Sequence, residues 1–277
     1  MALVQVEIRP LEGQAGVAVV TLDDPDRRNA LSEGMVGEIV EIFDRLESDP
    51  GVGAVVVTGA PPAFCAGANL SNLDRSGAAA RQGQGGGPAP AGDGGQGRSM
   101  RSIYEGFLRV GRSSLPTIAA VNGAAVGAGM NLALVCDLRI AGRSARFDTR
   151  FLDLGLHPGG GHTWMLHQLV GPQTARAMVL FGQILDGEAA AARGLAWDCV
   201  ADEELLDTAV AVAARAASAP PELARRAKDT LGRMGAVDEH ERAVDVELEA
   251  QLWSMSQPFF AERLAAVQRR VSSRSRS

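Results

Sequence analysis

The sequence predicts an α/β fold followed by a helical C-terminal region. Short β-branched runs end at turn residues, a helical pattern lies between the first two runs, and only helical patterns follow Ala201. The chain of 277 residues is long enough to bury a sizeable core. We therefore expect an α/β body over residues 1–200 and a helical region over residues 201–277.

The body begins with alternating strand and helix patterns. The segment 31–48 repeats its apolar residues at the spacing of a helix face, and Ser32 is a suitable N-cap for that helix. A strand on each side of it would complete an α/β unit. The runs predicted to be buried strands are Val17–Leu22, Ala54–Gly59 and Thr117–Gly123.

Residues 75–98 differ from the rest of the body because they contain no bulky apolar side chain. Such a stretch cannot offset its ordering entropy by burial, so we expect a mobile loop. A linker between two domains is the alternative. Strand-like sequence resumes at Leu115 in the same style, which favours an insertion within one domain.

Four amphipathic helical patterns, separated by Pro or Gly, make up the C-terminal region. They could pack on the body, on a partner subunit, or on both. Their ranges are Glu204–Ser218, Pro221–Met234, Asp238–Met255 and Gln257–Val271.

The composition is that of an ordinary soluble globular protein, with 46% hydrophobic and 22% charged residues. A formal net charge of −6 argues against a nucleic-acid partner. Three widely spaced cysteines suggest neither a disulfide framework nor a metal knuckle. The apolar run 117–135 is interrupted by Gly and Asn, so we expect a strand, a turn and a buried helix there, with no membrane span. We expect the three cysteines to be reduced thiols, as in a cytoplasmic protein.

Two turns share one design: Ala63–Leu70 and Gly123–Leu132 each place small residues where a strand gives way to a helical segment. Small residues let a ligand approach the backbone, and two N–H groups converging from such turns would form an oxyanion hole. The alternative is that they only permit tight strand–helix packing. The sequence contains no P-loop, GxSxG or HExxH motif, and no GxGxxG motif that follows a predicted strand.

The segments DDPDRRNALS, AFCAGANL, PTIAAVNGAAVGAGMNLALVCDLRIA and LGLHPGGG stand in the order, and at roughly the spacing, of the enoyl-CoA hydratase/isomerase (crotonase) superfamily. Over nearly its whole length the chain resembles that superfamily. The resemblance implies a superhelical core of repeated ββα turns and a helical region that forms a homotrimer or a dimer of trimers. It also implies a coenzyme A thioester as substrate, with no further cofactor.

By the same resemblance, the backbone N–H groups of Ala68 and Ala128 hold the thioester oxygen, and Ala66 and Gly67 contact the substrate. Hydratases of the family carry one catalytic glutamate three residues after the second donor, where this chain has Asn131. Alignment on the Gly-x-x-Pro-Gly sequence puts Phe151 at the second glutamate position.

Both carboxylates of the hydratase pattern are therefore missing. An amide can orient a water molecule or a thioester but has no proton to transfer, and a phenyl ring can only shape an apolar wall.

If proton transfer persists, the nearest candidates are Asp153, His157 and His162, although a structural role is the default interpretation for each. We favour His157, because imidazole titrates near neutrality and this residue precedes the glycine run that includes Gly160, in the loop that lines the substrate in relatives. The five-residue spacing of His157, His162 and His167 does not place them on one helix face, so no metal site is expected.

Arg27 and Arg28 occur where relatives contact the coenzyme A phosphates, which guanidinium groups suit. Arg269 and Arg270 are candidates for the same role toward a neighbouring subunit's ligand. The sequence thus predicts an acyl-CoA enzyme of lyase or isomerase type. Thioester hydrolysis, decarboxylation and non-catalytic acyl-CoA binding or regulation are the alternatives.

Overall fold

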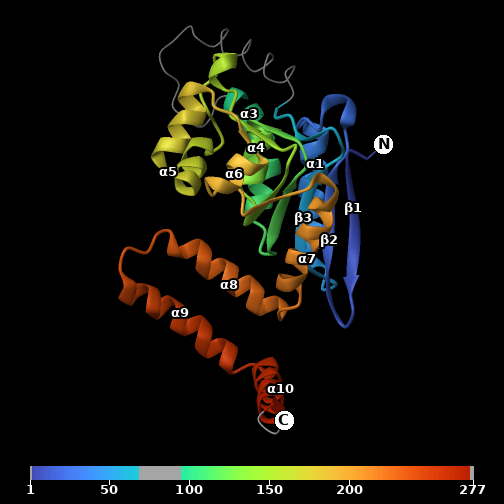
Figure 1. Ribbon diagram of the computed structural model, residues 1–277, viewed down its shortest axis with the longest axis vertical. Helices are drawn as coiled ribbons and strands as arrows, with labels where there is room; N and C mark the ends of the chain where they lie inside the picture. The colour runs from blue at the N-terminus through green and yellow to red at the C-terminus, as the bar shows by residue number, and fades with distance from the viewer. Residues whose placement is uncertain (1, 69–94, 275–277) are drawn as a thin grey trace.

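The computed structural model describes residues 2–68 and 95–274 (Figure 1). Most of the expected loop, residues 75–94, lies outside the described residues, and residues 95–98 form the start of a helix.

The β-branched segments form two sheets. The larger has the strand order β1-β2-β3-β5-β7-β10 and is parallel except for the β1–β2 pair. Its strands are β1 (Val4–Leu11), β2 (Gln14–Leu22), β3 (Val52–Gly59), β5 (Thr117–Val121), β7 (Leu138–Gly142) and β10 (Asp198–Val200). The smaller sheet has the order β4-β6-β8-β9. Its strands are β4 (Ala63–Cys65), β6 (Ala124–Val126), β8 (Arg146–Asp148) and β9 (Leu185–Asp186).

Three successive repeats place one strand in each sheet and then form a helix. They end in α3 (Gly95–Gly111), α4 (Ala128–Leu134) and α5 (His162–Phe181). The connections between these elements contain one further helix, α6 (Gly187–Ala192). They also contain short 3-10 turns at Pro25–Arg27, Leu152–Leu154 and Asp202–Glu204. The predicted ββα superhelix is confirmed.

Helix α1 (Glu33–Ser48) forms as its apolar spacing predicts. The Ser32 hydroxyl oxygen caps it by accepting a hydrogen bond from the Met35 N–H at 3.2 Å. Its buried face joins strands β2 and β3 and helices α3 and α4 in the larger hydrophobic core. That face consists of Met35, Val36, Ile39, Ile42, Phe43 and Leu46.

Helix α7 (Leu205–Ala217) covers the opposite face of the large sheet, where Ala209 and Ala213 are buried against Val19 and Val56. The approach is close, since a Cβ at Gly53 would lie 2.7 Å from the Ala217 Cα. The first of the four C-terminal helices is therefore a layer of the body.

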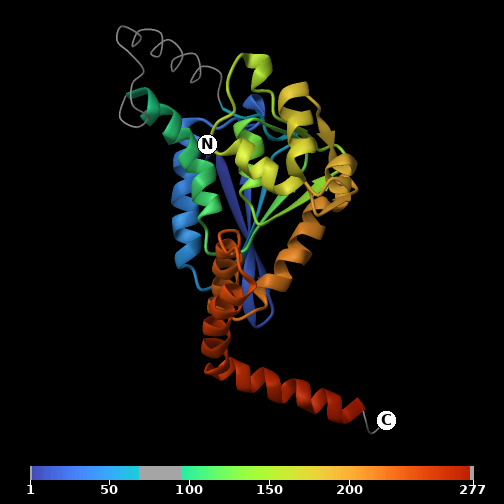
Figure 2. The ribbon, with the colours of Figure 1, turned by 90° about the vertical axis from the view of Figure 1, so that its left-hand side faces the viewer.

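The other three C-terminal helices are α8 (Pro221–Met234), α9 (His240–Met255) and α10 (Pro258–Arg274). Lys228 anchors α8 to the body through an ion pair with Asp137 at 2.7 Å and a hydrogen bond to the Leu115 carbonyl. Figures 1 and 2 show α9 and α10 extending away from the body. Among the described residues, no helix is long and apolar enough to span a membrane.

Candidate active site

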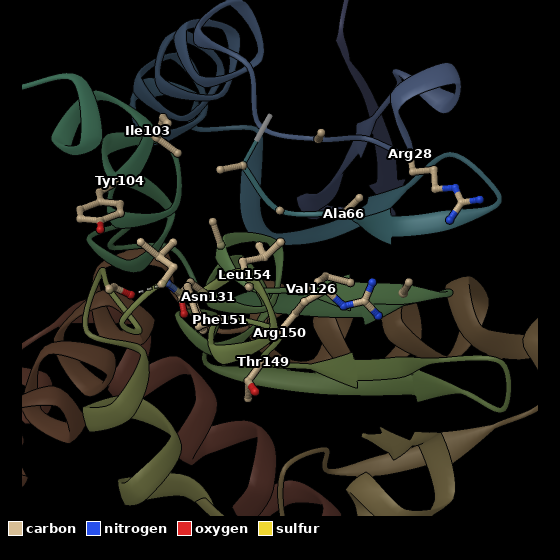
Figure 3. Close-up of a pocket in the computed structure, with 18 of the residues that line it drawn as sticks. Arg28, Ala66, Ile103, Tyr104, Val126, Asn131, Thr149, Arg150, Phe151 and Leu154 are labelled. Atoms are coloured by element: carbon tan, nitrogen blue, oxygen red, sulfur yellow. Dashed lines mark hydrogen bonds between the residues drawn. The ribbon is translucent and has the colours of Figure 1, made fainter. Parts of the chain in front are cut away.

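A cavity of about 540 Å³ opens between helix α3, the turn after β4, the start of α4 and the segment after β8. Figure 3 shows Tyr104 and Asn131 on one side of it and Arg28 on the far side. Most of its walls are apolar, with contributions from Ile103, Val126, Phe151, Leu154 and Leu156. The cavity has the size and mixed lining of a small-molecule site.

The first glycine turn contributes three successive residues, Ala66, Gly67 and Ala68, to the cavity wall. The Ala66 N–H donates to the Arg28 carbonyl at 3.0 Å, and the Gly67 carbonyl accepts from the Leu31 N–H at 2.8 Å. Gly67 has φ of +96°, a conformation that residues with a Cβ rarely adopt. Those backbone hydrogen bonds hold the turn against the segment that precedes α1.

The second glycine turn meets the first. Gly127 has φ +51° and ψ −114°, and its N–H donates to the Asp148 carbonyl at 2.9 Å. A Cβ at Gly67 would lie 2.7 Å from the Val126 carbonyl oxygen and 3.7 Å from the Ala128 nitrogen. Ala68 and Ala128, the two predicted thioester contacts, therefore line one cavity.

Asn131 lies in α4 three residues after Ala128 and lines the same cavity, with 1% of its surface exposed. Its Nδ2 donates to the Gly159 carbonyl at 3.0 Å. Its Oδ1 lies 2.7 Å from His162 Nδ1. Both ends of the amide thus have protein partners.

Phe151 also lines the cavity and is 9% exposed. Its ring meets the His162 ring edge-on, with 4.9 Å between the ring centroids and 64° between the planes. His162 itself is buried and does not line the cavity. Asn131 and Phe151, which occupy the two positions where hydratases of the family carry glutamate, therefore both contact His162.

The other candidates for proton transfer differ in position. His157 is exposed, lines the cavity, and has its Nδ1 2.7 Å from the Pro158 carbonyl oxygen. Asp153 is exposed and does not line it. Among the described residues, no three His, Cys, Asp or Glu side chains are placed to hold a metal ion.

Gly159 lines the cavity, whereas Gly160, the predicted contact, does not. Gly160 has φ of +68°, and a Cβ there would lie 2.6 Å from the Phe107 ring and 3.0 Å from Asn131 Nδ2. Its role is to let the loop approach α3 and α4 closely.

Arg27 and Arg28 both lie at the cavity with exposed side chains, and Arg27 forms an ion pair with Asp24 at 3.1 Å. Arg150 lines the same cavity, has φ of +47°, and forms an ion pair with Asp148. Three guanidinium groups therefore lie on that side of the cavity, two of them beside carboxylates.

Sequence reasoning missed Tyr104, Thr149 and Arg150 in the wall. Burial raises the pKa of the Tyr104 hydroxyl, so the phenol stays protonated at neutral pH. A Cβ at Gly159 would overlap that hydroxyl. Among the described residues that line the cavity, none carries a carboxylate.

The sequence of the chain matches a known protein family. A sequence model of the enoyl-CoA hydratase/isomerase family matches residues 12–262. The chain belongs to that family. A probable enoyl-CoA hydratase of Mycobacterium tuberculosis is 50% identical over 259 residues, which is 92% of this chain and 94% of the relative. A 1,2-epoxyphenylacetyl-CoA isomerase of Escherichia coli is 37% identical over 210 residues, 75% of each chain.

Solved structures of the enoyl-CoA hydratase/isomerase family agree with this fold. A crystal structure of an enoyl-CoA hydratase subunit from Geobacillus kaustophilus has a TM-score of 0.81 at 27% identity, covering 98% of this chain and 97% of that one. A probable enoyl-CoA hydratase/isomerase from Mycobacterium abscessus has a TM-score of 0.81 at 29% identity, covering 97% and 96%.

Proposed function

We propose that this family member is an acyl-CoA enzyme that polarises the thioester carbonyl of its substrate with the backbone N–H groups of Ala68 and Ala128. The convergence of the two glycine turns carries the proposal, because a Cβ at Gly67 would come within 3.7 Å of the Ala128 nitrogen. Two fixed N–H groups in an enclosed cavity stabilise the negative charge that develops on a thioester oxygen during enolate or tetrahedral-intermediate formation.

The proton chemistry should differ from that of a hydratase with two glutamates. Asn131 cannot exchange a proton at neutral pH, and Phe151 offers only an apolar edge. The titratable groups of the described wall, arginine aside, are His157 and Tyr104. His157 is the candidate for proton transfer, since a phenol that stays protonated is a poor base at neutral pH.

The arginines beside the cavity suit the phosphate groups of coenzyme A. A guanidinium group can donate two parallel hydrogen bonds to one phosphate group. The side chains of Arg27 and Arg28 are exposed at the cavity, where such a ligand could reach them. The thioester itself supplies the reactive carbonyl, so the proposed reaction calls for no separate cofactor.

The carboxylate-free wall also favours reactions that need the oxyanion hole without a pair of glutamates. Thioester hydrolysis and decarboxylation belong to this group. A protein that binds acyl-CoA without converting it is the remaining candidate.

A turnover assay over a panel of acyl-CoA esters, run alongside binding calorimetry, separates these functions. We expect micromolar binding of at least one ester, together with its isomerisation or slow hydration. Release of free coenzyme A would support thioester hydrolysis, and binding without turnover would support the regulatory alternative. Failure of every ester to bind would overturn the proposed function.

We further propose that residues 201–277 contribute to a homotrimer or a dimer of trimers. Helices α9 and α10 carry apolar side chains that are about half exposed, including Val244, Leu248, Leu252, Leu264 and Val267. Water contact with such a row is unfavourable, so a partner chain should cover it. Sedimentation showing a stable monomer at micromolar concentration would contradict this assembly.

A further inference from the structure

His162 is the first residue of α5, and its ring is buried beside Asn131 with 1% of the residue exposed. The Gly159 carbonyl can only accept a hydrogen bond, so the NH₂ group of Asn131 faces Gly159 and the amide oxygen faces His162. That oxygen can only accept as well. The ring hydrogen of His162 is therefore on Nδ1, which donates to Asn131 at 2.7 Å.

The second ring nitrogen, Nε2, is buried without a hydrogen-bond partner among the described residues. Burial lowers the pKa of His162 to about 4, so the ring is neutral at pH 7. A leucine would fill similar space against Phe151 without leaving a buried acceptor unpaired. Packing alone therefore does not explain a histidine here, whereas its Nδ1–H contact with Asn131 does.

Asn131 keeps half of its hydrogen-bonding capacity. An amide has two N–H donors and two oxygen lone pairs, of which Gly159 and His162 take one each. Asn131 lies one helical turn from Ala128, on the same side of α4 and at the same cavity. With a thioester oxygen at the Ala128 N–H, the free donor and acceptor would lie near the first carbons of the acyl group.

We propose that His162 is a positioning residue that fixes the Asn131 amide in one orientation, so that its free donor and acceptor recognise a hydroxyl group near the thioester end of the acyl chain. A hydroxyl group both donates and accepts, which complements what Asn131 has left. The ligand part of this proposal rests on the proposed function. The protonation and hydrogen bonding of the His162 ring do not depend on that function.

The ring is tested first, in the full-length protein labelled with ¹⁵N-histidine. Nitrogen NMR between pH 5.5 and 8 should show His162 with hydrogen on Nδ1 and a bare Nε2 throughout. Loss of one signal set in His162→Leu assigns the residue among the four histidines. Hydrogen on Nε2, or titration within that range, would overturn the positioning role.

Ligand recognition is tested by calorimetry with 3-hydroxybutyryl-CoA and butyryl-CoA. We expect the wild-type protein to prefer the hydroxylated ester about tenfold, the effect of one or two hydrogen bonds. His162→Asn keeps an N–H donor close to the position of Nδ1 and should retain most of this preference. His162→Leu should lose it while binding butyryl-CoA within about twofold of wild type. The matched control, His167→Leu, changes an exposed histidine of the same helix and should behave as wild type.

The possible failures are distinguishable. Binding of both esters without preference, or an undiminished preference in His162→Leu, would overturn the role of His162 and leave the proposed function intact. Binding of neither ester by the wild type would overturn the proposed function and the ligand part together. Should His162→Leu not fold, Asn131→Leu takes its place, because it removes the amide that the ring holds and should abolish the preference.

Discussion

Gly129 of helix α4 lies directly against the carbonyl group of Cys65. A Cβ at Gly129 would overlap the Cys65 oxygen and lie 2.7 Å from its carbonyl carbon. This contact joins the start of α4 to the strand that leads into the first glycine turn. The distance between the Ala68 and Ala128 N–H groups therefore depends on the absence of a side chain at position 129.

Gly129→Ala should destabilise the protein and weaken acyl-CoA binding. The added methyl group meets backbone, which cannot rotate away, so we expect a loss of about 1–3 kcal/mol in the free energy of unfolding. Gly37→Ala is the matched control, because Gly37 lies within α1 and its Cβ would meet nothing within 4 Å. That variant should gain about 0.5–1 kcal/mol. Urea unfolding of both variants measures the difference, and equal stabilities would argue against the contact.

Arg28→Ala should weaken coenzyme A binding about tenfold and reduce its dependence on salt concentration. A guanidinium–phosphate contact is strong at low salt and screened at high salt. Arg112→Ala removes the same charge from an exposed site that does not line the cavity. Calorimetry at two salt concentrations should give Arg112→Ala the same coenzyme A affinity and salt dependence as the wild-type protein. An unaltered affinity and salt slope in Arg28→Ala would remove the phosphate assignment.

The unmodified protein should hydrate crotonyl-CoA at least about a thousandfold more slowly than a family hydratase with both glutamates. Such a deficit corresponds to roughly 4 kcal/mol in the activation barrier. Asn131→Glu combined with Phe151→Glu should recover part of the rate. Asn131→Glu alone should gain less, because its carboxylate would replace the donor to the Gly159 carbonyl and accept the His162 Nδ1–H.

A spectrophotometric hydration assay of the unmodified protein, Asn131→Glu and the double variant tests the expected order of their hydration rates. Rapid hydration by the unmodified chain would show that the catalytic positions are misplaced.

Acid should destabilise the folded protein through His162. The pKa of this residue is about 4 in the folded state and about 6.5 in an unfolded chain. Between these values the unfolded state binds a proton that the folded state does not, so stability falls as pH falls from about 6.5 to about 4. From pH 7.5 to pH 5 the expected loss is about 2 kcal/mol.

His162→Asn should lack this part of the pH dependence, and comparing its urea unfolding with that of wild type at both pH values isolates the histidine. Identical pH dependence in the two proteins would contradict a buried neutral ring.

The elements that could be predicted from the sequence are those with local causes. Helix α1 has its own apolar face and its own cap, Ser32, so its sequence suffices. The glycine turns could be predicted because small residues follow β-branched runs in the sequence. Their mutual approach, seen at Gly67, depends on the stacking of successive repeats and could only be inferred from the resemblance.

Other parts of the site depend on tertiary packing alone. Tyr104 reaches the cavity because α3 packs beside α1 and α4; its neighbours Ile103 and Phe107 mark a buried helix face but do not indicate a cavity. His162 was one of several histidines in sequence, and its hydrogen bond to Asn131 spans 31 residues. Helix α7 is richer in Ala and Val than the three helices that follow it, but its position on the sheet depends on packing against β2 and β3, which its own sequence does not specify.

The structure of the protein with a bound acyl-CoA tests the proposed oxyanion hole most directly. We predict that the thioester oxygen lies within about 2.7–3.1 Å of both the Ala68 and the Ala128 nitrogen, with the acyl group beside Asn131 and Phe151. A thioester oxygen that contacts neither nitrogen, or a ligand bound outside this cavity, would contradict the proposal.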